Sequence, residues 1–229
     1  MKNSKSFVYG LGLALVLSVS AAAKPAQNWA GWVENYYLKP DAERVVPAVF
    51  ALSRGGYFEQ QGQPAMAIGF LASVFAQNPD KVQGWMREFR GLPVEHQRLV
   101  AAALWYSGQP GGAERVHELA RDSDPLVQTE VDSLVAWKHP SLRETPVLSQ
   151  SSLDLQWGAF LGSGDARYVT NVLAALGSAD GSLSSTARLA LAEKALAHPR
   201  VYEICQAEIA RQPAGVREEL STALLGRSH

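Results

Sequence analysis

Histidine, cysteine and acidic side chains can bind a metal or activate water, and we looked first for spacings that would let them do so. His117-Glu118 begins the pattern of a zinc-protease helix, but Leu119-Ala120-Arg121 follows, so the second histidine ligand is missing. The single cysteine and the wide spacing of the five histidines exclude the usual zinc motifs. These histidines are His96, His117, His139, His198 and His229. We therefore predict no metal site and no cofactor.

Nucleophile and phosphate motifs are also missing from the sequence. Gly162-Ser163-Gly164 lacks the Gly-x-Ser-x-Gly pattern of a nucleophile elbow and is typical of a helix that stops and restarts. The glycine-rich run 108–112 lacks the Lys-Ser/Thr pair that holds a phosphate and its metal. Neighbouring carboxylates such as Glu218-Glu219 fall on expected helix surfaces, where nothing would raise a pKa for acid catalysis. We predict no catalytic residue and favour a protein that is not an enzyme.

The only cysteine, Cys205, cannot form a disulfide within the chain. It follows Val201 by four residues and Ile204 by one, which places it on the apolar face of a helix. A reactive thiol needs a partly exposed setting that lowers its pKa. We expect Cys205 to be a small buried side chain of the core.

An aromatic stripe near the N-terminus is the best candidate for partner binding. Trp29, Trp32, Tyr36 and Tyr37 recur at the spacing of one helical face within residues 28–38. Such a stripe either contacts a partner or docks a terminal helix onto its own core. Both interpretations stay open from the sequence.

The first 23 residues have the order of a cleavable signal peptide. Lys2 and Lys5 precede an apolar run from Phe7 to Leu17, and Ala21-Ala22-Ala23 supplies the small residues that a signal peptidase requires. The run is shorter than the roughly 20 apolar residues of a membrane-spanning helix. We predict cleavage after Ala23 and a periplasmic or secreted protein with no stable membrane anchor.

The charge balance argues against a nucleic-acid partner. The formal net charge is −1, and the loss of two lysines with the signal peptide makes it −3. Arg87 and Arg90 are interleaved with Glu88, which is typical of a solvated helix face rather than of a phosphate-binding patch.

The secondary structure is predicted to be helical throughout, because apolar residues recur at helical spacing between breaks at Pro, Gly, Asn and Asp. Residues 64–76 are apolar on all sides, so this helix should be central. Residues 181–185 are predicted to form a polar turn, and Ser152 is predicted to cap a helix. Other expected helices cover 28–38, 94–106, 113–121, 186–197, 199–211 and 214–225.

We predict an all-α fold in which antiparallel helix pairs stack as an irregular α-solenoid or a bundle. Residues 113–137 resemble a unit of the HEAT type, in which a short acidic turn joins two helices. His139-Pro140 and His198-Pro199 each follow a helix, where a histidine can serve as a cap. The expected divisions are a signal peptide (1–23), an N-terminal half (24–137), a linker (138–151) and a C-terminal half (152–229).

Two stretches resemble a group of exported bacterial helical proteins that has no assigned activity. One is Trp157-Gly158-Ala159-Phe160 with the later Gly164-Asp165 and the run 198–201, and the other comprises 33–37 and 69–71. The motifs consist of aromatic, Gly and Pro positions, so the resemblance implies a shared fold and no catalytic residue.

Two classes of function follow from this sequence. The first is a non-catalytic interaction module with a protein or peptide partner, either a scaffold or an immunity-type protein. The alternative is an enzyme or small-ligand carrier with a pocket formed by residues far apart in sequence. For that alternative the candidate lining residues are Trp105, Tyr106, Trp137, Trp157 and Tyr202.

Overall fold

The computed structural model describes residues 28–121, 125–136 and 141–225, and this part of the chain is helical without a strand. The predicted signal peptide, 1–23, lies outside the described residues. The α-helices are α1 (Trp29–Glu34), α2 (Val45–Arg54), α3 (Gln63–Gln77), α4 (Pro79–Phe89), α5 (Val94–Tyr106), α6 (Gly112–Ala120), α7 (Pro125–Ala136), α8 (Gln150–Ser163), α9 (Ala166–Ala174), α10 (Gly181–Ala197), α11 (Pro199–Glu208) and α12 (Ala214–Leu225). Short 3-10 turns lie at Tyr36–Leu38, Ala42–Arg44, Ala175–Gly177 and Ile209–Arg211.

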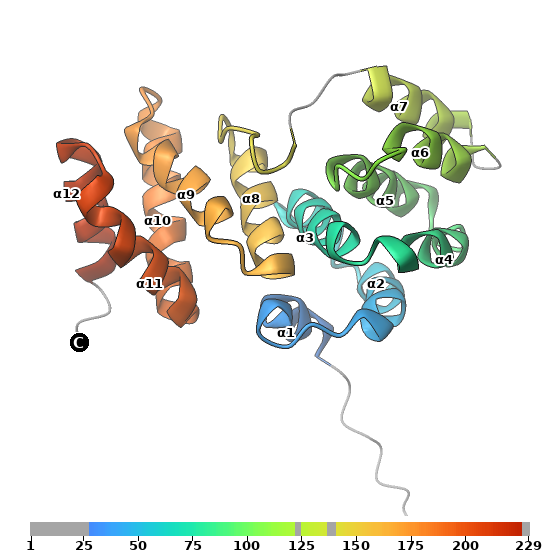
Figure 1. Ribbon diagram of the computed structural model, residues 1–229, viewed down its shortest axis with the longest axis horizontal. Coiled ribbons are helices and arrows are strands. Elements are labelled where there is room, and N and C mark those ends of the chain that lie inside the picture. The colour runs from blue at the N-terminus through green and yellow to red at the C-terminus, as the bar shows by residue number, and fades with distance from the viewer. Residues whose placement is uncertain (1–27, 122–124, 137–140, 226–229) are drawn as a thin grey trace, which may run out of the picture.

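The helices stack side by side along the long axis of the molecule (Figure 1). At one end of the stack is α12, and at the other are α4, α6 and α7. The helix α1 lies below the junction of α3 and α8 in this view. This arrangement confirms the predicted all-α fold of stacked helix pairs.

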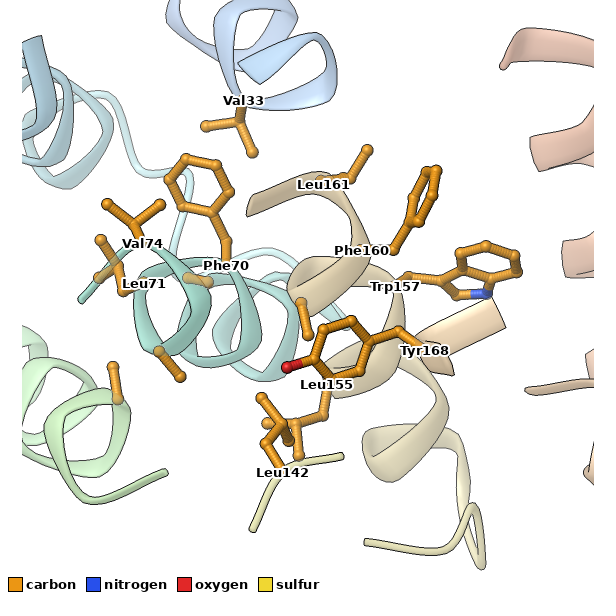
Figure 2. Close-up of a cluster of buried hydrophobic side chains, with 14 of the residues drawn as sticks. Val33, Phe70, Leu71, Val74, Leu142, Leu155, Trp157, Phe160, Leu161 and Tyr168 are labelled. Atoms are coloured by element: carbon orange, nitrogen blue, oxygen red, sulfur yellow. The ribbon is translucent and has the colours of Figure 1, made fainter. Parts of the chain in front are cut away.

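At the centre of the stack lies α3, which packs against α8 on one side and α5 on the other. Its buried side chains include Phe70, Leu71 and Val74, and Figure 2 shows Leu71 and Val74 on the side of α3 that faces away from α8. The prediction that residues 64–76 form a central helix is thus confirmed, because both of its sides are covered.

Glycines allow α3 and α8 to approach closely. A Cβ atom built on Gly69 would lie 1.9 Å from the Leu155 carbonyl oxygen, and one on Gly162 would lie 2.5 Å from the Phe70 carbonyl oxygen. Only a residue without a side chain lets two helix backbones pack at this separation.

Two expected helix starts are wrong, and in both places a polar side chain decides the start. Helix α10 begins at Gly181, so residues 181–185 are helical rather than a turn, because the Asp180 carboxylate accepts hydrogen bonds from the backbone N–H groups of Ser182 and Leu183. Helix α8 is capped by Ser149 instead of Ser152, which lies at the third helical position and completes a capping box.

The segment between α7 and α8 packs onto the core where it is described. Leu142 and Val147 are buried, and the Gln156 side-chain amide donates hydrogen bonds to the Leu142 and Thr145 carbonyl oxygens. A single cluster of buried side chains runs from Val33 to Leu224 and includes both predicted halves. The division into two halves stays a prediction.

Candidate functional site

The aromatic stripe packs largely against its own core. Tyr36 is 2% exposed, and its ring meets Phe70 edge-on at a centroid distance of 5.2 Å. The Trp32 ring also contacts Phe70, with the two ring centroids 5.9 Å apart. Trp29 is half-buried beneath the Arg44 guanidinium group, and Tyr37 contacts Phe160. Binding of a partner by these four aromatic residues stays a prediction.

A polar network fastens α1 to the junction of α10 and α11. Glu34 accepts hydrogen bonds from Lys194 Nζ and His198 Nε2, each at 3.2 Å. With the Nε2 proton directed at Glu34, His198 Nδ1 accepts a hydrogen bond from the Tyr37 hydroxyl at 3.3 Å. The backbone N–H of His198 does close α10 by bonding to the Lys194 carbonyl, as expected of a cap.

Burial and charge act in opposite directions on Glu34. Its partly buried position alone would raise the carboxyl pKa. The hydrogen bond from His198 and the positive charge of Lys194 outweigh burial, so the pKa of Glu34 falls below its ordinary value. Glu34 is therefore held as an anion, which suits a structural ion pair rather than an acid catalyst.

A second network has the order of a nucleophile, a base and an orienting acid. The Ser53 hydroxyl lies 2.8 Å from His96 Nδ1, and His96 Nε2 lies 2.9 Å from Glu59 Oε1. No sequence motif indicates this chain of bonds, because its members come from α2, the turn after α2 and α5. Such an order can in principle activate a serine.

The surroundings of Ser53 favour a structural role. Ser53 and His96 are only 8% and 7% exposed. The Phe58 ring packs edge-on against the imidazole, with the two ring centroids 5.1 Å apart. Ser53 lies at the C-terminal end of α2, where backbone carbonyls point outward. An oxyanion needs N–H donors, so this helix end opposes the negative charge that acyl transfer develops.

The arginine groove lies between α4 and α6 and encloses about 250 Å³. Val82 and Met86 form its buried apolar floor. The remaining lining residues are the polar Gln83, Arg87, Arg90, Arg115 and Glu118. The lining thus carries three guanidinium groups and one carboxylate.

Helix packing places the three guanidinium groups. Arg90 follows Arg87 by three positions, so the two residues lie on one side of the C-terminal end of α4. Arg115 comes from α6 and donates a hydrogen bond to the Gln109 side-chain oxygen. Gln109 in turn donates to the Phe75 carbonyl of α3, which ties the orientation of Arg115 to the core. Sequence reasoning assigned Arg87 and Arg90 to a solvated face and had no signal that Arg115 lies near them.

The described aromatic candidates for a ligand pocket come from three helices, with Trp105 and Tyr106 on α5, Trp157 on α8 and Tyr202 on α11. His117 lies on α6 and pairs with Asp132, whereas Cys205 is fully buried on α11 at the opposite end of the stack. Trp137 and His139 lie outside the described residues. Of the remaining aromatic candidates, Trp157 is buried in α8 and Tyr202 lies on α11.

Burial raises the pKa of the Cys205 thiol to about 12. The expectation that Cys205 is a small buried side chain of the core is confirmed by its full burial. Within the described ranges, no group of three or more His, Cys, Asp or Glu side chains is arranged to hold a metal ion. No helix in that same part of the chain has the length and apolar character needed to cross a membrane.

These observations define an all-α protein of stacked helices with an arginine-lined groove between two of them. Comparisons with known protein families, with curated proteins and with solved structures returned no match.

Proposed function

We propose that the chain is an exported, non-catalytic interaction module, and that an acidic segment of a protein partner binds in the arginine groove. The observation that carries this proposal is the placement of Arg87, Arg90 and Arg115 around the apolar floor of Val82 and Met86.

The chemistry of the groove fits a short acidic segment. A guanidinium group pairs with a carboxylate through two parallel hydrogen bonds, which makes arginine well suited to binding Asp and Glu. The floor offers Val82 and Met86, and methionine adapts to apolar side chains of different shape. The expected segment therefore carries at least one apolar residue between acidic ones.

A nucleic acid fits the groove less well. Phosphate-backbone binding depends on an extended stripe of positive charge, because each neutralised phosphate adds to the affinity. Here the groove lining carries only three arginines, and Glu118 lies among them. A peptide can avoid Glu118 by placing an uncharged residue there.

Export is supported by the signal-peptide order of residues 1–23 and by the resemblance to exported bacterial helical proteins. Mass spectrometry of the protein recovered from a periplasmic fraction should give an N-terminus at Lys24. Protein that retains Met1 and stays in the cytoplasmic fraction would contradict export without affecting the groove.

The binding proposal can be tested with a synthetic peptide that alternates Glu and Leu, measured by fluorescence anisotropy. The double variant Arg87→Glu/Arg115→Glu should weaken binding about tenfold or more, because two attractive charges become repulsive. Arg167→Glu is the matched control, since Arg167 is exposed on α9, far along the stack from the groove. Equal losses in both variants, or no binding by the unmodified protein, would refute the proposed site.

Two further measurements separate the alternatives. A lysine-containing peptide of the same length should not bind, and added salt should weaken binding of the acidic peptide. Trp29→Ala should leave the affinity unchanged if the arginine groove, rather than the aromatic stripe, contacts the peptide. A loss of binding in Trp29→Ala alone would instead favour the stripe.

A further inference from the structure

A second cavity, the hydroxyl cavity, lies at the centre of the stack and has different chemistry. It encloses about 350 Å³ between α3, the end of α5, residues 141–143, the end of α8 and the start of α9. Hydroxyl groups are unusually frequent in its lining, which consists of Ala72, Ser73, Ala76, Gln77, Tyr106, Ser107, Gly108, Ser141, Leu142, Arg143, Ser163 and Tyr168.

Two of these hydroxyl groups make no hydrogen bond to the described part of the protein, and the Ser73 hydroxyl is also buried. Ser73 is 3% exposed, and its hydroxyl makes no hydrogen bond. Tyr168 is 6% exposed and makes no hydrogen bond to any residue in the described ranges. Figure 2 shows the Tyr168 hydroxyl directed from α9 toward α3, the helix that carries Ser73.

The neighbouring serines behave differently. The Ser107 hydroxyl donates to the Leu104 carbonyl at 2.6 Å, and the Ser163 hydroxyl donates to the Ala159 carbonyl at 2.7 Å. These bonds lie within their own helices or helix ends, as is usual for serine. Ser73 and Tyr168 therefore stand out as groups whose hydrogen bonds are left for an occupant of the cavity.

An occupant is expected on energetic grounds. Buried polar groups are nearly always hydrogen-bonded, so the buried Ser73 hydroxyl requires a partner. A single water occupies about 30 Å³ of liquid, whereas cavities of roughly 300–1,000 Å³ are typical of small-molecule sites. The volume of about 350 Å³ therefore fits a small organic molecule.

The lining indicates an uncharged ligand. The only charged lining residue is Arg143, and its guanidinium group already pairs with the Asp165 carboxylate at 2.7 Å. Ala72, Ala76 and Leu142 add apolar surface between the hydroxyl groups. A ligand that matches this surface has C–H faces beside groups that both donate and accept hydrogen bonds.

We propose that the hydroxyl cavity binds an uncharged polyhydroxy compound, such as a sugar of monosaccharide size, with Ser73 and Tyr168 hydrogen-bonding its hydroxyl groups. This inference is independent of the arginine groove. It corresponds to the alternative function predicted from the sequence, a small-ligand carrier whose pocket is formed by residues far apart in sequence.

The direct test is saturation-transfer NMR of the purified protein with glucose, N-acetylglucosamine, myo-inositol and a library of neutral monosaccharides. Saturable binding by at least one compound, removed by Ala76→Trp at the exposed edge of the cavity, is the expected result. The absence of saturable binding across the library would overturn the proposal. Preferential binding of carboxylic acids that is lost in Arg143→Gln would also overturn it.

Matched serine variants give the sharper test. Ser73→Ala and Tyr168→Phe each remove one unpartnered hydroxyl and should weaken sugar binding about tenfold. Ser107→Ala removes a cavity hydroxyl that is already bonded to its own helix, so sugar affinity should stay within about twofold. Thermal unfolding without ligand checks folding, and Ser73→Ala should be at least as stable as the unmodified protein. Equal affinity in all three variants would refute the assigned contacts.

Discussion

Gly69 of α3 and Gly158 of α8 lie opposite each other where the two central helices cross. A Cβ on Gly69 would lie 1.9 Å from the Leu155 carbonyl oxygen of α8, and a Cβ on Gly158 would lie 1.9 Å from the Met66 carbonyl oxygen of α3. The pair of glycines therefore fixes how closely α3 and α8 approach. The same crossing holds Ser73 near the end of α8, since Gly162 also approaches Ser73.

Gly158→Ala should destabilise the protein by about 1–3 kcal/mol, because the added methyl group forces the backbones of α3 and α8 apart. Gly84→Ala is the matched control. Gly84 lies inside α4 with open space around the position of a Cβ, so alanine should stabilise the helix by up to about 1 kcal/mol. Urea unfolding measures both changes. Similar stabilities for the two variants would contradict the close helix crossing.

Glu34 should make stability depend on pH in a defined direction. The pKa of Glu34 is lowered from 4.5 on folding, so its contribution is fully present above about pH 4.5 and is lost as the pH falls through the folded value. At neutral pH, Glu34→Gln should cost about 1 kcal/mol, because the partly exposed ion pair is screened by solvent.

The difference in urea midpoint between the unmodified protein and Glu34→Gln should therefore shrink as the pH falls toward about 3. Glu144→Gln serves as the control, because Glu144 is exposed and makes no ion pair in the described part of the chain. A Glu34→Gln difference that stays constant over the whole pH series would show that the lowered pKa does not contribute to stability.

Cys205 should resist thiol reagents while the protein is folded. It is fully buried, and burial raises the pKa of its thiol to about 12, so almost no thiolate forms at mildly alkaline pH. Ellman's reagent should detect no thiol in the folded protein and one thiol per chain after denaturation, matching the single cysteine. Rapid modification without unfolding would contradict this placement.

The cap of α8 can be tested with two neighbouring serines. Ser149 accepts a hydrogen bond from the Ser152 backbone N–H, so Ser149→Ala should cost about 1 kcal/mol. Ser151 is exposed and makes no side-chain hydrogen bond in the described ranges, so Ser151→Ala should change the stability by less than about 0.5 kcal/mol. Thermal denaturation compares the two variants, and a larger loss in Ser151→Ala than in Ser149→Ala would contradict the cap at Ser149.

The Ser53, His96 and Glu59 network should not act as a hydrolase. We expect a fluorophosphonate probe to leave Ser53 unlabelled in the folded protein, because its hydroxyl is buried at a helix C-terminus, where backbone carbonyls rather than N–H groups point outward. Mass spectrometry of the treated protein measures the adduct. Labelling that disappears in Ser53→Ala and His96→Ala would contradict the proposed non-catalytic function.

Local patterns predicted much of the helical architecture. The helix over 94–106 has the expected bounds, and the all-round apolar character of 64–76 correctly placed α3 at the centre. The start of α10 was missed because residues 181–185 have little apolar periodicity, although Asp180 was available as a cap. Helix starts set by one polar side chain are harder to locate than faces set by many apolar ones.

The sequence by itself determined that this chain is helical, that α3 is central and that Cys205 lies on an apolar face, because helix periodicity depends on residues only a few positions apart. Only the tertiary structure decided which distant residues meet. Arg115 joins Arg87, and Tyr168 faces the helix of Ser73, through helix packing that no local spacing encodes. Both candidate sites consist of such long-range neighbours, which is why neither could be predicted from sequence motifs.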